Sequence, residues 1–101
     1  MLSSHMLSEL LRNNTLRTLF KAIVDRTRLQ GSELVDLDRS ITREKTYTYL
    51  EQLREAGLIE VDATLPLEDF RTYYITAEGL KMAREIHRIE AVSSTDMRVM
   101  R

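Results

Sequence analysis

Residues 31–61 read GSELVDLDRSITREKTYTYLEQLREAGLIEV, and residues 70–79 read FRTYYITAEG. In the first stretch Thr42 is a favourable N-cap, because a threonine hydroxyl can accept a hydrogen bond from a free N–H of the first helical turn. We therefore predict a helix over 43–56, and Gly57 suits the positive φ of the position that follows a helix. The inner face of this helix is apolar or small: Thr46, Tyr49 or Leu50, and Leu53. Its other face is polar and is expected to be exposed.

Two β-rich segments follow this helix and predict a hairpin. They cover residues 58–62 and 70–75, and the connection 63–69 contains the only proline of the chain, which disfavours a strand there. Thr76 is a candidate N-cap for a last helix over 77–92. The second half of the chain is therefore expected to fold as helix, strand, strand, helix.

Two helical segments are also expected before residue 31. Apolar residues at helical spacing predict one helix near 5–12 and another near 15–27, with an asparagine pair that breaks or bends the chain between them. Thr15 is the candidate N-cap of the second helix. Ser32 is the candidate N-cap of a short helix over 33–38.

This succession of elements resembles the winged helix-turn-helix superfamily over about residues 15–92. Residues 49–59, YLEQLREAGLI, resemble the YLxxLxxxGLI ending of the recognition (reading) helix in many small bacterial and archaeal regulators. Residues 74–79, YITAEG, are similar to the YxLTxxG segment of the multiple-antibiotic-resistance (MarR), phenolic-acid-repressor and arsenic-repressor types. Small archaeal and viral winged-helix proteins match equally well. The resemblance implies an α+β fold that is mostly helical, a winged helix-turn-helix with an extra N-terminal helix and a C-terminal helix.

The resemblance also implies a function, because the first turns of the reading helix enter the major groove of DNA in this superfamily. It places DNA contacts in the turn before the helix, in its first turns and near the hairpin tip: Arg39, Ser40, Thr42, Arg43, Lys45, Tyr47, Thr48 and Arg71. Arg43 would read guanine, Lys45 would hold phosphate, and Arg71 would reach the backbone or a minor groove. Structural alternatives are surface charges for Arg43 and Lys45, packing for Tyr47, and an ion pair with Asp69 or Glu68 for Arg71.

The charge of the chain supports a second interpretation. Residues 32–69 hold four basic and ten acidic side chains, so a formal charge of −6 lies between segments of +3 (1–31) and +2 (70–101). Since phosphate neutralisation by Lys and Arg dominates DNA affinity, this acidic middle also fits a winged-helix protein-interaction module that meets a basic partner. The module requires one negative face, formed by Glu44, Glu51, Glu60, Glu68 and Asp69. DNA binding requires four cations to converge: Arg39, Arg43, Lys45 and Arg71.

No motif indicates an enzyme. The three glycines are isolated, so they form no phosphate-binding loop, and the absence of cysteine removes disulfides and thiolate ligands. His87 is interpreted as a helix-surface residue, and Asp36 with Asp38 as surface charges rather than metal ligands. We therefore expect no enzymatic activity and no obligatory cofactor or metal. No apolar run approaches the roughly 20 residues of a membrane span, and a cytoplasmic location is expected.

One domain is expected over residues 7–92. Residues 1–6, MLSSHM, resemble an expression tag or a disordered start, and residues 93–101 are expected to form a flexible tail. Apolar stripes lie on the first and last helices: Leu7, Leu10 and Leu11, and Met82, Ile86 and Ile89. Because one small core does not readily cover both stripes, we predict a homodimer that would present two reading helices to duplex DNA. The alternative is a monomer in which the first helix folds back onto the last.

Overall fold

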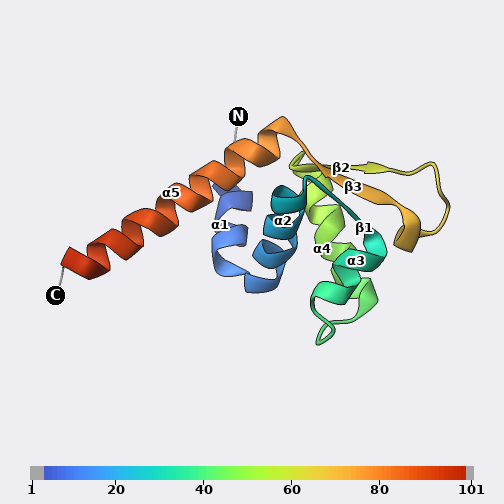
Figure 1. Cartoon of the computed structure of the whole chain (residues 1–101), viewed down its shortest axis with the longest axis horizontal. Coiled ribbons are helices and arrows are strands. Elements are labelled where there is room, and N and C mark those ends of the chain that lie inside the picture. The colour runs from blue at the N-terminus through green and yellow to red at the C-terminus, as the bar shows by residue number, and fades with distance from the viewer. Residues whose placement is uncertain (1–3, 100–101) are drawn as a thin grey trace.

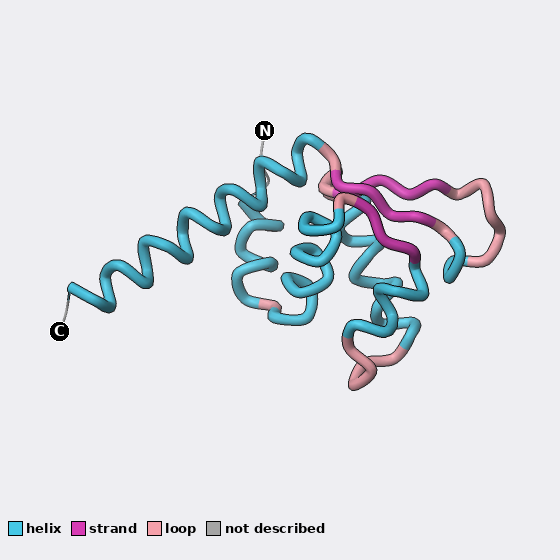
Figure 2. The backbone as a smooth tube through the Cα atoms, viewed as in Figure 1, coloured by secondary structure: helices cyan, strands magenta, loops and turns pink. Residues whose placement is uncertain are grey.

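The structure, a computed structural model, describes the backbone of residues 4–99 and the side-chain exposure of residues 4–92. Helices dominate, and a small sheet lies at one side (Figures 1 and 2). The elements in chain order are α1 (Ser4–Arg12), α2 (Asn14–Arg26), β1 (Arg28–Gln30), α3 (Gly31–Leu37), α4 (Arg43–Glu55), β2 (Ile59–Asp62), the 3₁₀ turn η1 (Glu68–Phe70), β3 (Thr72–Ile75) and α5 (Ala77–Val99). This arrangement confirms the predicted mostly helical α+β fold.

The sheet has three antiparallel strands in the order β1-β3-β2, one more than predicted. Leu29 of β1 and Val61 of β2 both pair with Tyr73 of the central strand β3. The hairpin tip also differs from the prediction, because Phe70 belongs to η1 rather than to a strand. Figure 2 shows β2 and β3 projecting from the helical body; we call these two strands and residues 63–71 between them the wing.

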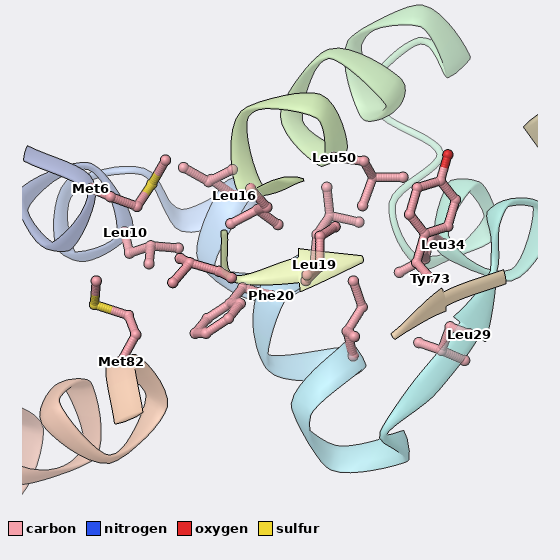
Figure 3. Packing of buried hydrophobic residues seen from close by; sticks show 14 of the residues in the cluster. Met6, Leu10, Leu16, Leu19, Phe20, Leu29, Leu34, Leu50, Tyr73 and Met82 are labelled. Carbon is pink, nitrogen blue, oxygen red and sulfur yellow. The ribbon is translucent and has the colours of Figure 1, made fainter. Parts of the chain in front are cut away.

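The core lies where α2 meets the other helices and the inner face of the sheet (Figure 3). The predicted stripe of α2 is confirmed, since Leu16, Leu19, Phe20 and Ile23 are at most 1% exposed, whereas Val24 is half-buried. Among the described residues, no buried side-chain nitrogen or oxygen lacks a hydrogen-bond partner.

The stripes of the first and last helices cover each other within one chain. Leu10 of α1 and Met82 and Ile86 of α5 are at most 1% exposed, and Figure 3 shows Met6 and Leu10 facing Met82. The expectation that one core leaves both stripes uncovered is therefore wrong. The first helix folds back onto the last, the packing that the alternative requires, and the homodimer stays a prediction. Leu11 lies at the margin of this contact, at 37% exposed.

Two helix starts differ from the predictions. Asn13, not Thr15, caps α2, because its side-chain oxygen accepts a 3.0 Å bond from the Leu16 N–H. The helix α3 begins one residue before Ser32, because β1 runs directly into it and the Glu33 carboxylate accepts a 3.0 Å bond from the Gln30 N–H.

The ends of the described chain are more helical than expected. Ser4 to Met6 form the first turn of α1, and α5 continues beyond Val92 to Val99. Residues 1–3 and 100–101, parts of the expected tag and tail, lie outside the described residues. None of the helices within residues 4–99 is both long and apolar enough to cross a membrane.

Candidate nucleic-acid interface

The helix α4 is anchored by one face and exposed on the other. Thr46, Leu50 and Leu53 are at most 1% exposed, in agreement with the predicted inner face. Burial of a leucine side chain stabilises a fold by roughly 1.5–3 kcal/mol, so two leucines hold the helix firmly against the core. The opposite side of the first turns, which we call the reading face, consists of Arg43, Glu44, Lys45, Tyr47 and Thr48; all are exposed except the half-buried Tyr47.

Both ends of α4 are fixed by local hydrogen bonds. At the start, the Thr42 hydroxyl accepts a 3.1 Å bond from the Lys45 N–H, which confirms the predicted cap. At the end, Gly57 adopts a φ of 79°, and the N–H groups of Gly57 and Leu58 bond to the carbonyls of Arg54 (2.9 Å) and Leu53 (3.0 Å). These two bonds form the Schellman motif, in which the following apolar residue, Leu58, is buried.

The wing folds onto the reading face through Asp69. One carboxylate oxygen of Asp69 accepts a 2.5 Å hydrogen bond from the Tyr47 hydroxyl, and the other accepts from the Arg43 guanidinium. The Tyr47 hydrogen bond, with help from Arg43, holds the pKa of Asp69 below its ordinary value. Burial and the Asp69 carboxylate raise the pKa of Tyr47, so this phenol stays protonated and acts as the donor. Two residues expected to contact DNA thus have a partner within the chain.

Two further contacts hold the wing tip in place. The Arg71 guanidinium does not pair with Asp69 or Glu68; it donates to the carbonyls of Leu65 (2.9 Å) and Pro66 (3.3 Å) and so closes the tip loop. The backbone then meets the start of α3, where the Gly31 N–H bonds to the Arg71 carbonyl at 3.0 Å. A Cβ atom at Gly31 would lie 2.3 Å from the Glu68 carbonyl oxygen, so this close approach requires glycine.

The remaining predicted site residues also bond locally. Arg39 donates to Asp36 at 3.3 Å, and the Thr48 hydroxyl donates to the Glu44 carbonyl at 3.0 Å. The ammonium of Lys45 lies 5.2 Å from the centre of the Tyr49 ring. Ser40 donates its backbone N–H and its hydroxyl to Asp38, and these bonds lower the pKa of that carboxyl. The residues of the turn and of α4 therefore form local contacts rather than one shared cluster.

An open groove runs along α4 beside the wing, and its lining is mainly acidic. It brings together three of the predicted DNA contacts with four glutamates and one glutamine: Arg43, Tyr47, Thr48, Glu44, Glu51, Glu55, Glu68 and Gln52. Of the four cations that DNA binding requires, only Arg43 lines this groove. Of the five acids that a negative face requires, Glu44, Glu51 and Glu68 line it, and Glu60 and Asp69 do not. Neither arrangement expected from the sequence is complete.

Sequence reasoning overlooked two features of this site. Glu55 could have been found, because it continues the helical spacing of Glu44, Thr48 and Glu51 along one side of α4. The role of Asp69 could not, because it lies 26 and 22 residues from its partners on α4 and no local pattern connects them. Within the described residues, no group of three or more His, Cys, Asp or Glu side chains is placed to hold a metal ion.

Comparisons with known proteins support the fold. The chain matches no protein-family model and no curated protein. Among solved structures it is similar to the oxidized form of MarR from E. coli, with a TM-score of 0.59 and 20% sequence identity, over 83% of this chain and 68% of that chain. At this identity the likeness concerns the fold alone. Together with the order of elements and the wing beside α4, it shows that the chain has a winged-helix fold.

Proposed function

We propose that this chain is a DNA-binding transcription regulator that places the first turns of α4 in the major groove. The main support for the proposal is that α4 is held firmly by one face while its other face is exposed. Buried leucines and local hydrogen bonds at both ends fix the helix, while Arg43, Glu44, Lys45 and Thr48 of its reading face are exposed. A winged helix uses this geometry to insert a helix into a groove of about 12 Å width. We expect no enzymatic activity.

The residues of the reading face have distinct roles in this proposal. Arg43 can form a bidentate pair with guanine O6 and N7 in the major groove. Lys45 and the free N–H groups at the start of α4 can hold a phosphate, because the positive end of the helix dipole favours an anion there. Ser40, Thr42, Tyr47 and Thr48 supply hydroxyl groups to phosphate oxygens, and Arg39 and Arg71 add contacts to the backbone on either side.

The test is fluorescence anisotropy with a mixture of duplex fragments at two salt concentrations. We expect affinity to rise as salt falls, and the double variant Arg43→Ala/Lys45→Ala to bind at least about tenfold more weakly, since each removed contact to a base or phosphate costs about 1 kcal/mol or more. The matched control is Lys81→Ala/Arg84→Ala, which removes the same charge from exposed positions of α5. No binding at low salt, or equal losses in both double variants, would contradict the proposal. Selection of bound fragments from genomic DNA would then define the preferred site.

The acidic groove favours a second candidate function, a protein-interaction module. Glu44, Glu51, Glu55 and Glu68 outnumber the single cation Arg43 in its lining, and that cation is neutralised by Asp69. Such a groove would accept a basic segment of another protein. A fluorescent oligo-lysine peptide distinguishes the two functions. The double variant Glu51→Gln/Glu55→Gln weakens peptide binding if the groove is the site, and does not weaken DNA binding if α4 is a reading helix.

We further propose that the chain acts as a homodimer through α5. Because α1 covers the first part of α5, the apolar stripes near the chain ends do not supply the interface. The candidate interface is the last part of α5, beyond the Lys21–Glu90 ion pair with α2, which Figure 1 shows extending away from the other described elements. Isolated helical segments are marginal in water, so pairing with a second copy would stabilise this part of α5.

A further inference from the structure

The reading face is already engaged by an anion that belongs to the chain itself. Asp69 binds Arg43 and Tyr47, two of the residues expected to contact DNA. A carboxylate offers paired acceptor oxygens, as a phosphate does, and the O6/N7 edge of guanine likewise offers an arginine two acceptors. We propose that the wing tip, residues 65–71, is an autoinhibitory latch in which Asp69 occupies the donors of Arg43 and Tyr47 that guanine and phosphate would otherwise engage, so that DNA and the wing compete for these two side chains. This inference rests on the proposed DNA-binding function.

The latch has a defined closed position. The tip loop is closed by the bonds from Arg71 to the carbonyls of Leu65 and Pro66, so Asp69 is presented on a structured turn rather than on a loose loop. The backbone of Glu68 lies against Gly31 at the start of α3, close enough to exclude a side chain there. The carboxylate of Asp69 is therefore directed at α4 by contacts on both sides of it.

The latch can also open, because little apolar surface holds it. Leu65, Leu67 and Phe70 are 48%, 60% and 52% exposed, so the tip adds no side chain of its own to the buried core. The Arg43 side chain is 61% exposed, and ion pairs at such positions contribute little to stability in water. A protein whose binding-competent form is only partly populated binds its ligand more weakly in proportion to that population. The wing would thereby set the affinity for DNA.

The variant Asp69→Asn tests the latch, with Glu68→Gln as its matched control. Both remove one negative charge from adjacent positions of the wing tip, but in the described contacts only Asp69 bonds to Arg43 and Tyr47. We expect Asp69→Asn to bind duplex DNA about three- to tenfold more tightly, as for an open population of roughly 10–30% in the unmodified chain. Glu68→Gln should raise the affinity for duplex DNA by less than about twofold. Equal gains in DNA affinity for the two variants would show that only the removal of a negative charge matters. This result would overturn the latch but not the proposed DNA binding.

A second measurement reports on the latch without DNA. Hydrogen exchange at the Gly31 N–H, which bonds to the Arg71 carbonyl, should become several-fold faster in Asp69→Asn and stay unchanged in Glu68→Gln. Tyr47→Phe, which removes the hydroxyl donor and keeps the ring, should accelerate exchange at the same amide. Unchanged exchange in Asp69→Asn and Tyr47→Phe, with folding verified by thermal melting, would overturn the latch. If exchange accelerates but no variant binds DNA, the proposed function fails, and the autoinhibitory role fails with it.

Discussion

Two glycines near the end of α4 are required for different physical reasons, and their substitution separates these reasons. Gly57 has a φ of 79°, and a Cβ atom there would meet nothing within 4 Å. Gly57→Ala should therefore lower the free energy of unfolding by about 1–2 kcal/mol through backbone strain alone, and Gly57→Asn by less, since asparagine tolerates this conformation. At Gly79, a Cβ atom would lie 2.2 Å from the Leu58 carbonyl oxygen, so Gly79→Ala should cost more than Gly57→Ala.

Urea unfolding followed by circular dichroism measures these three changes. Equal losses for alanine and asparagine at position 57 would contradict an origin in backbone conformation. A loss at position 79 smaller than that at position 57 would show that α5 does not pack on the end of α4 as closely as the structure has it. Both glycines lie away from the reading face, so we expect DNA binding by the folded variants to be retained.

Residue by residue, the sequence predicted contacts that span a few positions and missed those that span many. Thr42, Gly57 and Thr76 were identified because a cap is decided within one turn; the Thr76 hydroxyl accepts a 2.9 Å bond from the Gly79 N–H. Thr15 was predicted to cap α2, but Asn13, two residues earlier and also a favourable cap residue, caps it instead. The pairing of Asp69 with Arg43 depends on how the wing folds, and no local pattern specifies this.

Among the elements, β1 was not predicted, because it too depends on a segment far away in the sequence. Its three residues, Arg28–Gln30, alternate between exposed and buried around one apolar side chain, but a run of three is too short to predict a strand. The strand exists because β3 supplies its hydrogen-bond partners, and the ladder is continued by bonds from Ile75 to Thr27 and from Gly31 to Arg71. A strand this short is defined by its neighbour. The order of the remaining helices and strands was predicted because each has its own apolar period or caps.

The packing of α1 on α5 gives an element-scale prediction. Leu10 is fully buried between these helices, whereas its neighbour Leu11 is 37% exposed. Leu10→Ala should lower the free energy of unfolding by about 2–5 kcal/mol, since it removes buried methyl groups and leaves a cavity. Leu11→Ala, the same chemical change, should cost well under half as much. Chemical denaturation measures both; similar losses would show that α1 does not cover α5 in solution.

For the whole molecule, the uneven charge is carried by different parts of the fold. The segment of −6 contains α3, α4 and most of the wing, whereas the segments of +3 and +2 contain α1, α2 and α5. A monomer with a paired Arg43 therefore offers DNA few free cations at α4. Two copies would bring two reading faces and twice the number of phosphate contacts, and the affinity and its dependence on salt would both increase. Dimerisation through α5 would thus offset the weak charge of each reading face.

Sedimentation equilibrium tests this assembly with a pair of matched substitutions. Val92, on the extended part of α5, is 52% exposed, and Leu67, at the wing tip, is 60% exposed. We expect the unmodified chain to be a dimer at micromolar concentration and Val92→Asp to shift it to monomer, because a buried unpaired carboxylate is costly at an interface. Leu67→Asp introduces the same charge at a similarly exposed position and should remain dimeric. A monomeric unmodified chain, or a dimer disrupted by Leu67→Asp alone, would show that α5 is not the interface.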